Sequence, residues 1–133
     1  MDITLKKKIN ILVHLAGVDG HFDDSERAFI YNICLRHGVD LDLIGYLIAD
    51  PEPIEDIGNL PHETAMDYLT ESILLMMVDG KVLPTEVKFC LDIGERLGFE
   101  RNDVDKIIQE TRTDLSISYD DLGKRIKKLK YPN

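Results

Sequence analysis

The stretch VDGHFDDSE, residues 18–26, decides the fold, because the chain writes the same pattern again as VDGKVLPTE at residues 78–86. Each copy places a glutamate seven residues after the aspartate of its Asp-Gly pair. Aligning residues 18–40 with residues 78–100 gives eight identical pairs in 23 positions without a gap. A glycine in the left-handed conformation commonly ends a helix. The pattern therefore indicates two helix-turn-helix repeats related by a pseudo-twofold axis.

Apolar residues recur at helical spacing on both sides of each Asp-Gly turn. The run Ile73-Leu74-Leu75-Met76-Met77-Val78 is apolar on every side, which is typical of a central, buried helix. No strand-like alternation of useful length is present. The sequence predicts one all-α domain over residues 1–133, a compact helical bundle of about seven helices. Repeat 1 covers about 3–50, with helices at about 2–18, 24–37 and 40–50. Repeat 2 covers about 61–112, with helices at about 61–79, 84–97 and 103–112. A basic C-terminal helix covers about 119–130.

The composition narrows the class of protein. With 44% apolar and 31% charged residues the chain is typical of a soluble globular protein. A net charge of −9 repels phosphate backbones, so we expect no nucleic-acid partner. The basic residues 124–130 offset the negative end of the helix dipole in a C-terminal turn. For binding to a membrane they predict peripheral contact at most.

The first residues and the cysteines favour a cytoplasmic location. MDITLKKKIN lacks the apolar core and cleavage site of a secretory signal. Cys34 and Cys90 have no metal-type spacing, so we expect reduced side chains in the core.

An EF-hand is the first calcium site to test against the Asp-Gly turns. Gly20 and Glu26 match the glycine at loop position 6 and the bidentate glutamate at position 12. Positions 1 and 3 must supply oxygen ligands, but they are Leu15 and Gly17 in the first copy. The second copy lacks these oxygens too, and the sequence excludes an EF-hand.

Helix capping and a shared acidic site remain as two interpretations of the glutamates. Asp23-x-x-Glu26 is a capping box, which explains the first glutamate locally. Leu83 stands where Asp23 does and has no side-chain acceptor, so we expect capping to leave Glu86 unexplained. If the two turns meet across the pseudo-twofold axis, their carboxylates form one acidic patch that a divalent cation relieves. Its candidate metal ligands are Asp19, Glu26, Asp79 and Glu86.

The motifs DGHFDDSER…LRHGVD and DGKVLPTEVKF…ERLGFERNDV resemble the two halves of the TerB-like tellurite-resistance family, over roughly residues 3–110. This resemblance implies an all-helical bundle in the cytoplasm, sometimes at the inner membrane face. It also implies an acidic surface that chelates divalent metal, within systems for tellurite and other chemical stress. By position, that surface corresponds to Asp19 and Glu26 in one copy and to Asp79 and Glu86 in the other.

Three classes of function follow from these patterns. The first is a non-enzymatic acidic module that binds a divalent cation (Ca²⁺, Mg²⁺, Mn²⁺ or Zn²⁺), serves as a protein-interaction scaffold, or does both; the resemblance implies a place for it in the response to tellurite or chemical stress. The second is a metal-dependent hydrolase that uses the acidic cluster. The third is a protein–protein interaction module without metal, whose acidic face recruits a protein partner. The four histidines show no ligand spacing, and no nucleophile motif or phosphate loop is present, which favours the non-enzymatic classes.

Overall fold

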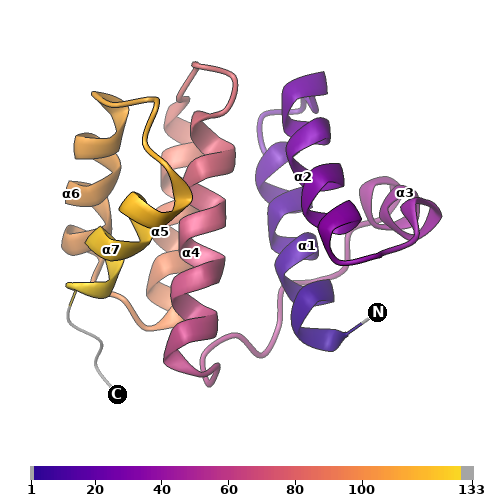
Figure 1. Cartoon of the computed structure of the whole chain (residues 1–133), viewed down its shortest axis with the longest axis horizontal. Helices are drawn as coiled ribbons and strands as arrows, with labels where there is room; N and C mark the ends of the chain where they lie inside the picture. The colour runs from indigo at the N-terminus through magenta and orange to yellow at the C-terminus, as the bar shows by residue number, and fades with distance from the viewer. Residues whose placement is uncertain (1, 130–133) are drawn as a thin grey trace.

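The computed structural model describes residues 2–129, and within that range every regular element is a helix (Figure 1). The prediction of an all-α bundle of about seven helices is therefore confirmed. One hydrophobic core draws side chains from every helix. The helices are α1 (Ile3–Ala16), α2 (Asp24–Arg36), α3 (Leu41–Ala49), α4 (His62–Met77), α5 (Pro84–Leu97), α6 (Arg101–Arg112) and α7 (Tyr119–Lys127).

Side-chain caps fix where several of these helices begin. Asp2, Asp40 and Ser118 each accept a hydrogen bond from a backbone N–H in the first turn of the helix that follows. Such caps satisfy amide groups that have no partner inside the helix. Pro61 is the residue before α4, with φ −53° and ψ 147°, so the helix begins one residue later than the sequence predicts.

Other predicted boundaries also shift by a few residues. The helix expected over 103–112 begins at Arg101, and the helix expected over 61–79 ends at Met77. The basic helix expected over 119–130 ends at Lys127, and residue 130 lies outside the described residues. Its apolar residues Leu122 and Ile126 are fully buried.

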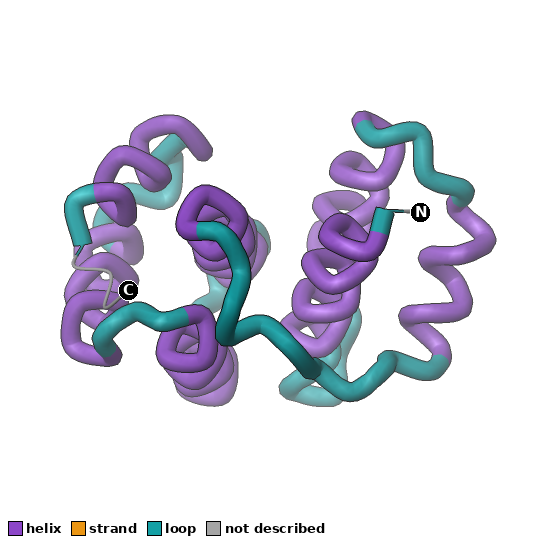
Figure 2. Tube along the Cα trace, turned by 90° about the horizontal axis from the view of Figure 1, so that it is seen from below, coloured by secondary structure: helices purple, strands orange, loops and turns teal. Residues whose placement is uncertain are grey.

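α4 is the central helix of the bundle, as its apolar sequence predicts. It contacts α1 on one side and α5 and α7 on the other (Figure 1). Ten of its sixteen residues are buried. Figure 2 shows the connector of residues 50–61 passing from the end of α3 to the start of α4. Cys34 and Cys90 are free thiols and fully buried, as expected.

The two Asp-Gly turns have the same local geometry. Gly20 and Gly80 have φ angles of 82° and 75°, which other residues rarely adopt. Asp19 and Asp79 each accept a hydrogen bond through Oδ1 from the backbone N–H two residues later, at 2.9 Å in both turns. Because α1 and α4 run in the same direction, both turns lie at the upper end of the molecule in Figure 1.

A nearly buried ion cluster joins α1 to α4. Lys8 of α1 is 7% exposed, and its Nζ lies 2.9 Å from Asp67 Oδ2 and 3.7 Å from Glu71 Oε1. Arg36 of α2 approaches the same oxygen of Glu71 at 3.9 Å, while Tyr119 of α7 donates to Asp67 Oδ1. The cluster thus connects four helices at the packed face of α4.

No helix within residues 2–129 is both long and apolar enough to cross a bilayer.

We expect Lys8→Met to destabilise the protein by about 3 kcal/mol, because it leaves the buried carboxylate of Glu71 without its nearest cation. Burial already raises the pKa of Glu71. Chemical denaturation measures the loss, and the double variant Lys8→Met/Glu71→Gln should recover much of it. The control is Lys88→Met, which breaks the exposed Lys88–Asp92 pair and should cost less than about 1 kcal/mol. Equal losses in Lys8→Met and Lys88→Met would contradict a structural role for the buried cluster.

Candidate metal centre

Three carboxylates from the two Asp-Gly turns and the start of α2 lie close together. Asp23 and Glu26 belong to the start of α2, while Asp79 belongs to the turn before α5. One oxygen of each residue lies within 4.8 Å of an oxygen of the other two. Among the described residues this is the one grouping of three or more His, Cys, Asp or Glu side chains close enough to share an ion.

Glu26 is the most buried member of the cluster. Glu26 is 3% exposed, and its Oε1 accepts a hydrogen bond from the Asp23 backbone N–H at 3.4 Å. In return, Asp23 Oδ1 accepts the Glu26 N–H at 3.0 Å, which completes the predicted capping box. Glu26 Oε2 is buried and has no hydrogen-bond partner. Buried polar atoms in folded proteins nearly always have a partner, so this oxygen is a candidate to accept a hydrogen bond or to contact a cation.

Glu86 occupies the corresponding position at the start of α5. It is also 3% exposed, and its Oε1 accepts the Leu83 backbone N–H at 2.9 Å. The expectation that capping leaves Glu86 unexplained is therefore wrong. Leu83 lacks a side-chain acceptor, so the Glu86 N–H bonds to the Leu83 carbonyl at 3.0 Å, and only the glutamate half of the box is formed by a side chain.

Burial and neighbouring charges act together on the two glutamates. The pKa of Glu26 is raised to about 7, and burial is the largest cause. The Asp23 N–H opposes this rise, while the negative charges of Asp23, Glu86 and Asp79 add to it. The pKa of Glu86 is also raised, first by burial and then by the charges of Asp79, Asp19 and Asp23. Each glutamate is thus affected by carboxylates of the other turn.

Asp23 differs from the glutamates because it is well supplied with donors. The Ser25 hydroxyl donates to its Oδ1 at 2.7 Å, in addition to the Glu26 N–H. These hydrogen bonds, and a contact with Asp79, hold the pKa of Asp23 below its usual range. Asp23 therefore stays ionised beside the buried glutamate.

The structure places the four candidate ligands in one region but gives them unequal positions. Glu26 and Asp79 belong to the trio whose oxygens lie within 4.8 Å of one another. Asp19 and Glu86 lie close enough for the charge of Asp19 to affect the Glu86 carboxyl. The residue that sequence reasoning missed is Asp23. It was assigned to capping alone, although its absence from the second copy was a visible asymmetry.

All the atoms that the cluster could offer to a metal ion are carboxylate oxygens. Such oxygens favour Ca²⁺, Mg²⁺ and Mn²⁺, whereas Zn²⁺ commonly takes nitrogen or sulfur ligands as well. His21 is exposed in the first turn, where its backbone N–H donates to Asp19 Oδ1. The residues present therefore fit a hard divalent cation better than zinc.

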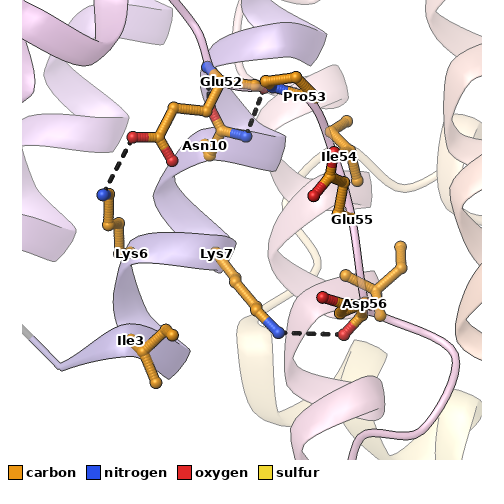
Figure 3. A pocket seen from close by; sticks show the side chains of 10 residues that line it. Ile3, Lys6, Lys7, Asn10, Glu52, Pro53, Ile54, Glu55 and Asp56 are labelled. Atoms are coloured by element: carbon orange, nitrogen blue, oxygen red, sulfur yellow. Dashed lines mark hydrogen bonds and ion pairs between the residues drawn. The ribbon is translucent and has the colours of Figure 1, made fainter.

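A separate hollow of about 170 Å³ lies between α1 and the connector (Figure 3). Asn10 bonds both backbone polar groups of Glu52, through Nδ2 at 2.8 Å and Oδ1 at 3.0 Å. Lys6 pairs with the Glu52 carboxylate at 3.0 Å, and Lys7 donates to the Asp56 carbonyl at 3.1 Å. As Figure 3 shows, these polar side chains fasten the connector to α1, which gives the hollow a structural role.

Comparison with protein-family models, with curated proteins and with solved structures finds no match to this chain. The TerB-like resemblance rests on the sequence motifs alone.

We expect Glu26→Gln to raise the melting temperature of the cation-free protein at pH 8. Folding raises the pKa of Glu26 from about 4.5 to about 7, so the folded state binds more protons in this window and stability falls as the pH rises. The glutamine can keep the capping bond to the Asp23 N–H but carries no charge. Its advantage should therefore shrink as the pH is lowered from 8 to 5. Thermal unfolding in the presence of a chelator measures this.

Glu110→Gln is the control for that experiment, because Glu110 is exposed on α6. It should leave the melting temperature nearly unchanged at every pH. A loss of stability in Glu26→Gln at all pH values would contradict the account and show that the charge of Glu26 supports the fold.

Proposed function

We propose that this protein is a non-enzymatic helical module that binds one divalent cation between its two Asp-Gly turns. One observation carries the proposal. Glu26 Oε2 is buried without a partner, in a residue whose carboxylate lies within 4.8 Å of oxygens from Asp23 and Asp79. A cation there would satisfy this oxygen and offset the mutual repulsion of the carboxylates.

The ligands of the proposed site come from both repeats. Asp23 and Glu26 at the start of α2, together with Asp79 from the turn before α5, would hold the ion directly. Asp19 and Glu86 add negative charge beside them. Their oxygen donors support Ca²⁺, Mg²⁺ or Mn²⁺ ahead of Zn²⁺. By linking two turns that lie sixty residues apart, the ion would stabilise the upper end of the bundle.

The binding of a cation in this place is what the TerB-like resemblance implies. We extend the proposal to a scaffold role in tellurite or related chemical stress, and for this step the motif resemblance is the support. A metal-dependent hydrolase is the alternative that uses the same carboxylates. The carboxylates favour a binding role, because each uses its Oδ1 or Oε1 to hold its own turn or helix start.

We expect one Ca²⁺ or Mn²⁺ ion to bind per chain and to raise the melting temperature. At a free concentration one hundred times the dissociation constant, binding adds about 2.7 kcal/mol to the free energy of unfolding. Asp79→Asn and Glu26→Gln should each weaken binding at least about tenfold, since each removes a charged ligand. Glu86→Gln removes a neighbouring charge and no direct ligand, so it should reduce the thermal shift less than either of these variants does. Calorimetry and thermal unfolding with Ca²⁺, Mg²⁺, Mn²⁺ and Zn²⁺ measure these effects.

The matched control is again Glu110→Gln, which removes one exposed carboxylate far from the turns and should bind the ion as the wild type does. If no ion shifts the melting temperature, the glutamates serve only as helix caps and the proposed site does not exist. Cation-dependent hydrolysis of a phosphate ester that is lost in Asp79→Asn would instead support the hydrolase.

A further inference from the structure

A shallow groove of about 320 Å³ runs between α5 and α6 and begins at the turn before α5. Its apolar side chains come from that turn and from α5. Its cations come from α5 and from the two ends of α6. The apolar residues are Val82, Pro84, Val87 and Leu91, and the cationic residues are Lys88, Arg101 and Arg112.

Two of these cations are held in place by a shared carboxylate. Asp92 Oδ2 lies 2.7 Å from Lys88 Nζ, and Asp92 Oδ1 lies 2.8 Å from Arg101 Nη1. Glu95 also contacts Nη1 of Arg101. A guanidinium has five N–H donors, so Arg101 keeps donors for a further acceptor after these contacts. The pairs therefore orient the cationic edge before any ligand arrives.

Arg112 adds a cation at the opposite end of α6. It is exposed, and its Nη1 donates a hydrogen bond of 3.5 Å to Gln109 Oε1. α5 and α6 run in opposite directions, so Arg112 lies near the start of α5 and Arg101 lies farther along it (Figure 1). The apolar strip thus has a cation at each end and Lys88 beside it.

The first repeat has different residues at the positions that correspond to the apolar side of this groove. Arg27 stands where Val87 does, and its guanidinium lies over the Phe22 ring at 5.0 Å. Asp24 stands in place of Pro84. The first repeat therefore covers its apolar side chain with its own arginine and places an acid where the second repeat has an apolar residue.

We propose that the groove between α5 and α6 binds an acidic, amphipathic segment of a partner protein. Its apolar side chains would lie on Val82, Val87 and Leu91, and its carboxylates would meet Lys88, Arg101 and Arg112. Charge complementarity selects this occupant. The protein carries a net charge of −9, yet three cations border this apolar strip. Asp92 and Glu95 offset part of the charge of Lys88 and Arg101, whereas Arg112 bonds the neutral amide of Gln109. An amphipathic helix laid into an apolar groove is a common way to recognise a peptide.

Binding in the groove is independent of the proposed metal centre. The groove residues do not include the clustered carboxylates, so the test is carried out in chelator. Failure of peptide binding would leave the cation site untouched, and the reverse also holds.

The test uses a fluorescent amphipathic peptide of about 14 residues, with glutamates on one face and leucines and phenylalanine on the other. Fluorescence anisotropy should give a dissociation constant below about 100 μM for the wild type. Arg112→Glu and Lys88→Glu should each weaken binding at least about tenfold, and Val87→Asp should do the same. Lys106→Glu is the matched control, because Lys106 is exposed on α6 outside the groove, and it should change binding less than about twofold. Circular dichroism checks that each variant is folded.

Three results would overturn the proposal. The first is no binding of the peptide, or equal loss in Lys106→Glu and Arg112→Glu. The second is binding to anionic phospholipid vesicles that depends on Arg112 while the peptide does not bind. The third is a wild-type dimer in light scattering that becomes a monomer in Val87→Asp, which would assign the groove to a second copy of this chain.

Discussion

The packing of α1 against α4 is the constraint on which the rest of the structure depends. The two helices run in the same direction and end at the same level, so the Asp-Gly turn that follows each one meets the other. Each turn needs a carboxylate near the next helix N-terminus to satisfy free amide groups. Two locally favourable caps therefore bring four or more negative charges into one small region. Local helix chemistry and long-range electrostatics oppose each other at this point.

That opposition explains why the centre is asymmetric. A fully symmetric pair of capping boxes would add a further aspartate at position 83, beside Asp23, Glu26, Asp79 and Glu86. The chain has Leu83 there, and its backbone carbonyl takes over part of the cap. The carboxylates that are present are enough to hold a cation, and they repel one another less than they would with a further aspartate at position 83. The second repeat also leaves its α5–α6 groove open, whereas Arg27 covers Phe22 in the first. The two halves share a turn geometry but differ in what their surfaces can bind.

Most of the fold could be predicted from the sequence, because its signals are local. The positive φ angles of Gly20 and Gly80, the cap at Asp23 and the buried character of α4 all follow from residue type and spacing. Helix ends such as Arg101 and Lys127 were less well predicted, since one turn more or less changes few contacts. The pseudo-twofold repeat itself stays an interpretation of the alignment.

The candidate site was harder to predict, because its composition depends on how the two turns face each other. Sequence reasoning named Asp19, Glu26, Asp79 and Glu86 from the repeated spacing, which treats both copies alike. The structure shows that Asp23 approaches Asp79 across the interface between the turns, which no spacing within one copy reveals. It also shows that Glu86 caps Leu83, because a carboxylate can accept a backbone N–H without a reciprocal side chain. The groove was missed for a similar reason, since Arg101 and Arg112 join α5 residues only in three dimensions.

The most direct measurement of the central claim is anomalous X-ray diffraction from crystals of the wild-type protein grown with Mn²⁺. The account predicts one strong anomalous peak between the two Asp-Gly turns, within coordination distance of Glu26 Oε2 and of carboxylate oxygens from Asp23 and Asp79. A strongest anomalous peak elsewhere in the crystal would contradict the account. The absence of any peak between the two turns would contradict it as well.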